Sequence, residues 1–312
     1  MQAAHDPDCY LCPRVVRANG TQNPDYTGAY AFDNDFPSLS ADAETHSTDN
    51  NDDPLNRTAP AHGSCRVLCW SEKHDATLAS LTPTEMERVV LLWKDEYETL
   101  STQQHVANVL IFENKGTEIG VSNLHPHGQI YATSFVPDTA TRMRQAQSNY
   151  AQKFGGKSML QTMLQQTHTQ KELLVEAGEF FSVIVPFAAR FAYETWIVPH
   201  RHVNSLAQMH ANELSELAQL YQNQVKRYDL LFKRVAPNIT LIHNAPCDTD
   251  SGDAHMNAHW CFHLAYQPPL RDPEKMKFLA GFESGTNNIV NPVQPELAAA
   301  QLRLIDIGEW TP

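Results

Sequence analysis

Apolar residues recur at helical spacing in two stretches of the chain, and each stretch predicts an amphipathic helix. At the start of the first stretch, Thr82 can cap the helix, Pro83 suits its first position and Glu85 completes a capping box. The two apolar stripes are Met86, Val89, Val90, Trp93 and Tyr97, and then Leu214, Leu217, Tyr221, Val225 and Tyr228. Stripes with this period face a protein core far more often than a cofactor, so we expect both helices to be packed against the core.

The two helices belong to an internal repeat. Residues 65–93 align with residues 192–221, without a gap from His74 and His202 onward. In both copies a strand leads through a His-containing turn into the helix, and another strand follows the helix. The strands that follow are 108–114 and 238–244.

The repeat predicts an α+β fold made of two tandem units, residues 1–140 and 141–312, each with an antiparallel sheet and a covering helix. Two polar, Asp-rich stretches, 41–53 and 248–255, separate recognisable elements. Neither keeps the spacing of an EF-hand calcium loop, so we expect both to be solvated loops.

The formal net charge of −13 argues against a broad nucleic-acid-binding surface, which needs an exposed basic stripe. The longest apolar stretch, 180–199, is interrupted by Pro186, Arg190 and Glu194, and therefore predicts buried sheet and not a membrane span. The N-terminus has no basic region leading into an apolar core, so we expect no signal peptide and a cytoplasmic location.

The segment 112–135 carries the strongest candidate chemistry, the run His125-Pro126-His127-Gly128-Gln129 entering an alternating strand. Pro126 favours an extended His125, and alternation would place both imidazoles on one face. Gly128 would leave room for a ligand near the backbone. Imidazole is largely neutral at pH 7 and suits attack on phosphorus, although a strand-end pair satisfied by backbone carbonyls is the alternative.

The six cysteines, at 9, 12, 65, 69, 247 and 261, are too sparse for a disulfide-stapled scaffold, so we expect reduced thiols or a metal site. Cys9 and Cys12 form a CxxC turn, which occurs in redox sites, in zinc sites and by chance. A second CxxC is missing from the sequence, so nothing supports a site of four cysteines.

The ordered motifs of the chain resemble those of the galactose-1-phosphate uridylyltransferases, a family of the histidine-triad superfamily. The motifs are HDPDCYLCPR, NPDYTGAYAFDNDFPSL, CRVLCWSEKH, IFENKG followed by SNLHPHGQIYA, then IHNAP, HWCFHLAYQPPLR and KFLAGFE. They cover nearly the entire chain. The resemblance implies two histidine-triad-like units, with HPHGQ in the first and a degenerate copy in the second.

By this resemblance His127 is the nucleophile that becomes uridylylated, Gln129 donates hydrogen bonds to the phosphoryl oxygens, and the carbonyl of His125 orients the His127 ring. The implied reaction is a ping-pong transfer of UMP between UDP-glucose, glucose 1-phosphate, galactose 1-phosphate and UDP-galactose. The enzyme is expected to be a homodimer with shared sites.

The resemblance also supplies the binding residues. Asn34 and Asp35 are expected on the uridine side, and Asp35 could accept hydrogen bonds from both ribose hydroxyls. The residues expected at the diphosphate and the transferring phosphoryl group are Asn114, Gly120, Val121 and Ser122. Those expected at the sugar phosphate are Lys277, Phe278, Phe282 and Glu283.

The implied metal site is one structural zinc per chain, held by Cys9, Cys12, His74 and His125. Many family members hold a second metal, usually iron, with one Glu and three His. The matching positions here are Met143, Ala265, His243 and His263. Because two ligands rarely hold a metal firmly, we expect this second site to be lost, unless His255 or His259 restores it.

The chain also departs from the family pattern. Members carry arginines ahead of the CxxC turn that contact phosphate across the subunit boundary, and no such stretch precedes Cys9, which predicts weaker phosphate binding. The expected sugar-contacting Gln is missing after Glu283. Two other functions therefore stay open. One is a nucleotide-sugar phosphorylase or adenylyltransferase of the same superfamily, and the other is a non-catalytic nucleotide-binding protein.

Overall fold

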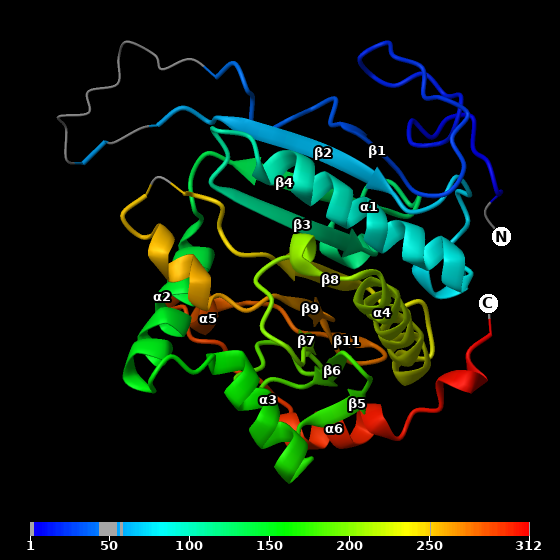
Figure 1. The fold of residues 1–312 in the computed structure, drawn as a ribbon. Helices are drawn as coiled ribbons and strands as arrows, with labels where there is room; N and C mark the ends of the chain where they lie inside the picture. The colour runs from blue at the N-terminus through cyan, green and yellow to red at the C-terminus, as the bar shows by residue number, and fades with distance from the viewer. Residues whose placement is uncertain (1–2, 44–54, 57–58, 250, 312) are drawn as a thin grey trace.

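A nine-stranded antiparallel sheet organises the computed structural model, which describes residues 3–43, 55–56, 59–249 and 251–311 (Figure 1). The strands are β1 (Tyr30–Asp33), β2 (Gly63–Cys69), β3 (Asn108–Lys115), β4 (His127–Thr133), β5 (Leu174–Ala177), β6 (Phe181–Ile184), β7 (Thr195–Pro199), β8 (Asn238–His243) and β9 (His263–Gln267). Their order in the sheet is β1-β2-β4-β3-β8-β9-β7-β6-β5. The α+β class predicted from the repeat is confirmed.

The two repeat copies meet at the centre of this sheet. Strand β3 pairs antiparallel with its repeat counterpart β8, from Leu110 opposite His243 to Lys115 opposite Asn238. On either side of this pair the order β3-β4-β2 is mirrored by β8-β9-β7. The two sheets expected from the sequence are therefore joined edge to edge into one, and neither copy leaves its β3 or β8 edge open.

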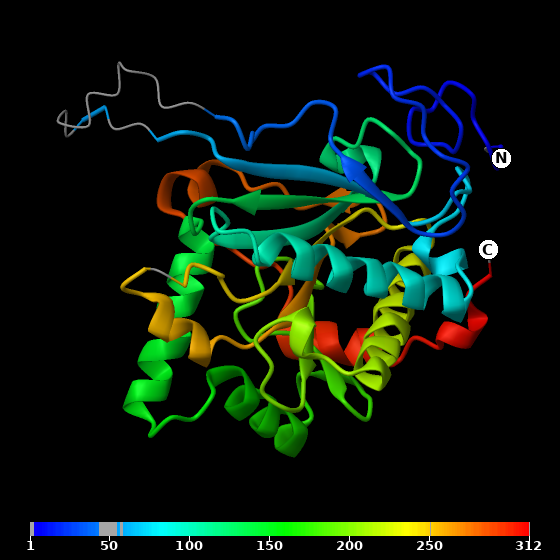
Figure 2. The same cartoon turned by 45° about the horizontal axis from the view of Figure 1, so that its top comes forward.

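The predicted helices are α1 (Pro83–Ser101) and α4 (Ala211–Phe232), and they pack against each other over one face of the sheet (Figures 1 and 2). Every residue of the two predicted stripes is buried. The rings of Trp93 and Tyr221 meet at 5.6 Å between the helices. The capping box of α1 is present as predicted, because Glu85 N donates to Thr82 Oγ1 and Thr82 N donates to Glu85 Oε2.

Shorter elements complete the fold. The remaining helices are α2 (Asp138–Lys153), α3 (Met159–Gln170), α5 (Gly281–Thr286) and α6 (Pro295–Arg303). The 3-10 turns are η1 (Leu78–Ser80), η2 (Thr117–Ile119), η3 (Leu206–Gln208), η4 (Ala254–His259) and η5 (Ile307–Glu309), and β10 (Leu270–Asp272) pairs with β11 (Lys275–Met276). Within the described residues, no helix is both long and apolar enough to cross a membrane.

The two predicted loops have different outcomes. Residues 44–53 of the first lie outside the described part of the chain. In the second, Asp248 accepts two hydrogen bonds from the buried Arg144 of α2, at 2.8 and 2.9 Å, and η4 begins at Ala254. This loop is therefore anchored to α2 and is not simply solvated.

Packing against neighbouring residues gives a reason for the glycine at position 128. A Cβ at Gly128 would overlap the ring of Trp70 and lie 2.8 Å from the carbonyl oxygen of Phe112. The Gly128 backbone therefore makes room for the buried indole of Trp70, which directly follows β2, and the expectation that it also leaves space for a ligand stays a prediction.

This packing predicts that Gly128→Ala lowers the free energy of unfolding by about 1–3 kcal/mol, because neither the indole nor the neighbouring carbonyl can move away. The measurement is chemical denaturation of the purified variant. Gly285→Ala is the matched control, since a Cβ there meets nothing within 4 Å. Equal stability of the two variants would contradict the packing role.

Candidate active site

His127 is the first residue of β4, at the edge where the strand meets the loop that precedes it. Its Nδ1 lies 2.7 Å from the carbonyl oxygen of His125. The carbonyl of Pro126 accepts from Trp70 N at 3.0 Å, which fixes the same loop to the end of β2. His125 lies before β4, so strand alternation does not place the two imidazoles as the sequence predicted.

The hydrogen bond to His125 determines the proton position on the His127 ring. A carbonyl oxygen only accepts, so Nδ1 carries the proton and Nε2 keeps its lone pair. Burial lowers the pKa of His127, while the hydrogen bond to His125 and the charge of Glu113 act in the opposite sense. The ring is thus neutral and oriented, with the lone pair of Nε2 unused by this contact.

Two cavities adjoin His127. The smaller, of about 140 Å³, is lined by Asn34, Asp35, Ser122 and Gln129, together with apolar side chains. The larger, of about 360 Å³, is lined by polar residues of β3 and by the segments 75–78 and 235–237. The ring at the start of β4 is common to both, so a ligand could extend across it from one cavity to the other.

The predicted uridine-side residues lie together in the smaller cavity. Asn34 Oδ1 accepts from Phe36 N at 2.9 Å, which shapes the turn after β1. Asp35 pairs with Arg17 at 3.3 Å, and both side chains are nearly inaccessible. The guanidinium of Arg17 also lies over the Phe32 ring at 4.3 Å, so Arg17 contacts two residues that line the cavity.

The residues predicted at the phosphoryl groups are distributed between the cavities. Asn114 and Val121 line the larger cavity, and Ser122 and Gln129 line the smaller. Gly120 lines neither of them, and its N–H donates to the carbonyl of Thr117 at 3.0 Å. The expected contact between Gly120 and a phosphate group stays a prediction.

The residues predicted at the sugar phosphate form a separate group. Lys277 donates to Glu283 at 2.7 Å, and Phe278 and Phe282 are exposed by 69% and 57%. None of the four lines either cavity beside His127. The chain therefore does not bring this group into either cavity beside its own His127.

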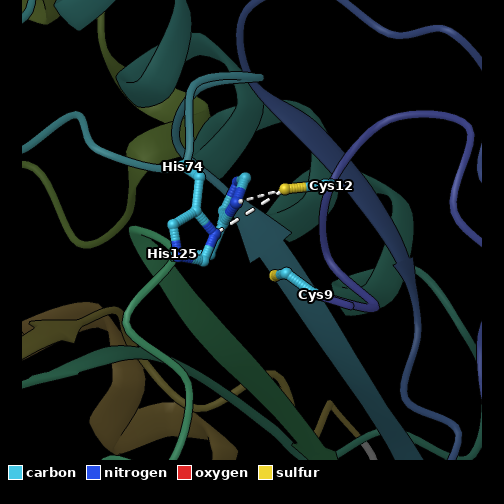
Figure 3. A group of neighbouring side chains, drawn as sticks. All are labelled: Cys9, Cys12, His74 and His125. Atoms are coloured by element: carbon cyan, nitrogen blue, oxygen red, sulfur yellow. Dashed lines mark hydrogen bonds between the residues drawn. The ribbon is translucent and has the colours of Figure 1, made fainter. Parts of the chain in front are cut away.

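Four potential metal ligands converge beside the His127 loop. Cys9, Cys12, His74 and His125 are all buried, and their ligand atoms lie within 4.8 Å of one another. Figure 3 shows both imidazoles directed at Cys12, with the Cys9 sulfur beside them. Cys12 Sγ is 3.7 Å from Nδ1 of His74 and 3.5 Å from Nδ1 of His125. The group could bind a metal.

Outer contacts orient both imidazoles of this cluster. Nε2 of His125 donates to the carbonyl of Ser71 at 2.9 Å, and Nε2 of His74 faces the Asp6 carboxylate at 3.9 Å. Each ring is thereby left with Nδ1 as the free donor atom for a metal. Burial lowers the pKa of His125 to about 4, which keeps its ring neutral, as a metal ligand must be.

The residues at the expected second metal site are arranged differently. His243 and His263 face each other across β8 and β9 with their rings stacked at 4.6 Å, and Trp196 contacts His263 at 4.8 Å. Met143 lies in α2, and Ala265 lies two residues beyond His263 in β9. In the described residues, the only group of three or more potential ligands is the Cys9 cluster. Loss of the second metal stays a prediction.

Sequence reasoning missed several residues of the site. Arg17 lies in an ordinary polar turn of the sequence, and only the fold brings it to Asp35. In the sequence, Glu113 stands out only as a residue of the IFENKG motif. The apolar lining of the smaller cavity includes Leu11, Phe32, Phe36 and Val67. Strand alternation around β1 and β2 could have indicated the side chains of this lining.

Two family models match the chain. The model for the N-terminal domain of galactose-1-phosphate uridyl transferase matches residues 1–137, and the model for its C-terminal domain matches residues 143–309. The predicted boundary of the two units, between residues 140 and 141, stays a prediction.

Curated relatives carry the same family name. The galactose-1-phosphate uridylyltransferase of Haemophilus influenzae is 36% identical over 97% of this chain and 84% of its own length. The enzyme of that name from Rattus norvegicus is 37% identical over 96% of this chain and 78% of its own length.

Solved structures share the fold. A uridylyltransferase structure superposes with a TM-score of 0.84 at 23% identity, covering 97% of this chain and 93% of that chain. An ADP-glucose phosphorylase from Arabidopsis thaliana superposes with a TM-score of 0.79 at 21% identity, covering 98% and 91%. At these identities the likeness concerns the fold alone.

The ligand cluster predicts about one tightly bound transition metal per chain. Cys12→Ser should lose most of this metal and unfold at a lower temperature, because the metal contributes folding free energy only through a complete ligand set. Elemental analysis and thermal melting measure both effects. Cys247→Ser, which changes a half-buried thiol outside the cluster, is the control. Equal metal content in the two variants would show that the cluster is not the binding site.

Proposed function

The chain belongs to the galactose-1-phosphate uridyl transferase family, and from this premise we propose that it transfers UMP from UDP-glucose to galactose 1-phosphate through His127. It is a nucleotidyltransferase of galactose metabolism. The observation that carries the mechanism is the 2.7 Å contact between Nδ1 of His127 and the carbonyl of His125. The contact leaves Nε2 free to attack.

In the first step, the Nε2 lone pair attacks the α-phosphorus of UDP-glucose. The Nε2–P bond forms, the P–O bond to the β-phosphate breaks, and glucose 1-phosphate departs. Because the leaving group is a stable anion, no proton needs to be supplied. The ring keeps its Nδ1 proton, still donated to His125, and becomes a uridylyl-imidazolium cation.

In the second step, a phosphate oxygen of galactose 1-phosphate attacks the same phosphorus. The P–N bond breaks, UDP-galactose forms, and the imidazole returns to its neutral state. Gln129 and Ser122 lie beside the ring and would donate to the phosphoryl oxygens as their charge develops. Asn34 and Asp35 would hold the ribose in the smaller cavity, with the base against the apolar lining.

Zinc is the metal we propose for the Cys9 cluster. Bond lengths of ~2.3 Å to sulfur and ~2.1 Å to nitrogen at a tetrahedral angle place these atoms about 3.6 Å apart. The two Cys12 to histidine distances, 3.5 and 3.7 Å, agree with this value. When bound, zinc would stiffen the loop that ends at His127. We also propose that the separate second site, at His243 and His263, holds no iron.

The separation of Lys277, Phe278, Phe282 and Glu283 from His127 supports a homodimer. A site completed by a second copy would bring this group over the cavities of the first, as expected from the family resemblance. The exposed rings of Phe278 and Phe282 suit burial at such an interface. We also propose a cytoplasmic location.

The proposed reaction predicts a mass increase of one uridylyl group on incubation with UDP-glucose. Intact-protein mass spectrometry should detect this adduct on the parent and not on His127→Asn, which lacks the nucleophile. Replacing the exposed His105 by Asn is the matched control and should leave labelling unchanged. ADP-glucose in place of UDP-glucose should give no adduct. An adduct formed only with ADP-glucose would instead favour the adenylyl-transferring relative.

The two-step reaction also predicts parallel double-reciprocal plots. UDP-glucose and labelled glucose 1-phosphate should exchange label without any galactose 1-phosphate, because the first half-reaction is complete in itself. Exchange that requires galactose 1-phosphate would mean direct transfer in a ternary complex, and His127 would then be a phosphate ligand.

The shared site predicts complementation between inactive variants. His127→Asn lacks the nucleophile, and Lys277→Met should bind sugar phosphate poorly. After subunit exchange, each mixed dimer would hold one site with both groups intact, so activity should reappear. Mixing each variant with itself is the control. Failure to regain activity, with mixed dimers demonstrated by native mass spectrometry, would show that each chain completes its own site.

A further inference from the structure

Glu113 is a buried carboxylate that has no role in either step of the proposed reaction as described above. It lies in β3 with 4% of its surface exposed. Its oxygens accept from Trp70 Nε1 at 2.9 Å and from the Tyr221 hydroxyl at 2.8 Å. Both donors are neutral. Lys115, the next residue on the same face of β3, is directed at Asp229 instead, at 3.7 Å.

A buried anion without a cationic partner is costly. Among the described residues, no Lys, Arg or His forms an ion pair with Glu113, so two neutral hydrogen bonds are all that offsets its desolvation. Buried charged side chains are usually paired with an opposite charge. A buried carboxylate without such a pair indicates a positively charged group that forms only during the reaction.

The position of Glu113 indicates that partner. Glu113 and His127 line the same cavity of about 360 Å³. A negative charge on Glu113 would favour a cationic His127 ring, because both side chains border this one cavity. The imidazole is neutral in the free protein and acquires its positive charge only when Nε2 takes the uridylyl group.

The fold itself does not require a carboxylate at this point. Strands β4 and β9 begin at His127 and His263, and two residues further along they pair with Phe112 and Leu241 respectively. The residue after Leu241 is Ile242, which is therefore the counterpart of Glu113 and is likewise buried. The half without the HPHGQ chemistry is built with an apolar side chain there.

We propose that Glu113 is a positioning residue whose fixed negative charge stabilises the uridylyl-imidazolium formed on His127. The inference rests on the proposed function. Glu113 takes no proton and forms no bond in either step. Its charge lowers the free energy of the cationic intermediate relative to the free enzyme, in a cavity where little water screens the interaction.

A purely structural role would have different consequences. Through Trp70 and Tyr221, Glu113 ties β2 to α4, and loss of that tie would lower stability without changing how much uridylyl-enzyme forms at equilibrium. The discriminating quantity is the equilibrium constant for the reaction of enzyme and UDP-glucose to uridylyl-enzyme and glucose 1-phosphate. This constant measures the charge stabilisation directly.

The test uses Glu113→Gln, which removes the charge and keeps the shape. Parent and variant are incubated with set ratios of UDP-glucose to glucose 1-phosphate, and intact mass spectrometry measures the uridylylated fraction. We expect the equilibrium constant to fall about tenfold in the variant, as for the loss of roughly one pKa unit of charge interaction. Glu113→Asp keeps the charge and should stay close to the parent.

Tyr221→Phe is the matched control, because it removes one hydrogen bond to Glu113 and leaves the charge. It should lower the melting temperature and leave the equilibrium constant unchanged. If Glu113→Gln does not fold, the same equilibrium constant is measured on the double variant Glu113→Met/Tyr221→Phe. This variant has no charge at position 113, and it also lacks the Tyr221 hydroxyl that would otherwise lose its acceptor.

An unchanged constant in the neutral variants, or an equal fall in Tyr221→Phe, would overturn the inference while the parent still forms its adduct. Absence of any adduct on the parent would instead overturn the proposed function. The two failures are therefore distinguishable.

Discussion

The hydrogen bond from Nδ1 of His127 to the carbonyl of His125 connects every part of the site. On one side of it, the ring of His125 belongs to the buried metal-ligand cluster and is held by the Ser71 carbonyl at the end of β2. On the other side, Nε2 of His127 is left for chemistry. Displacement of the loop by about an ångström would carry this contact beyond hydrogen-bonding distance and free the ring to rotate. Order in the cluster is thus transmitted to the His127 ring through the backbone of His125.

The second half of the sheet repeats this geometry without the same surroundings. His263 begins β9 as His127 begins β4, and its Nδ1 lies 3.2 Å from the carbonyl of Cys261, two residues earlier. There, however, the ring is stacked on His243, contacts the tilted ring of Trp196 and is buried. The repeat therefore supplies the orientation of a histidine in both halves. In the first half, that histidine lies beside two cavities.

The parts of this molecule that follow local rules could be predicted from the sequence. The stripes of α1 and α4 and the capping box at Thr82 agree with the structure. The proximity of the four metal ligands also agrees, but it was expected only from the family resemblance, because His74 and His125 are far from Cys9 and Cys12 in the chain. The parts that depend on non-local packing could not. The glycine at position 128 is required by the ring of Trp70, which lies just beyond the end of β2. The joining of the two sheets depends on the pairing of β3 with β8, which the sequence does not display. Asp35 resembles a free ribose ligand until the fold places Arg17 against it.

Charge gives a physical reason for the second copy proposed above for this reaction. The chain carries a net charge of −13, and its ligands are anions. The cations nearest the two cavities are already engaged, because Arg17 is paired with Asp35 and Lys115 faces Asp229. Glu113 adds a negative charge, which favours the cationic ring and opposes the approach of phosphate. Neutral donors such as Gln129 and Ser122 can meet a phosphoryl group without cancelling that charge. A cation brought by a second copy would then attract the sugar phosphate from the far side of the phosphorus, where it does not compete with the imidazolium for Glu113.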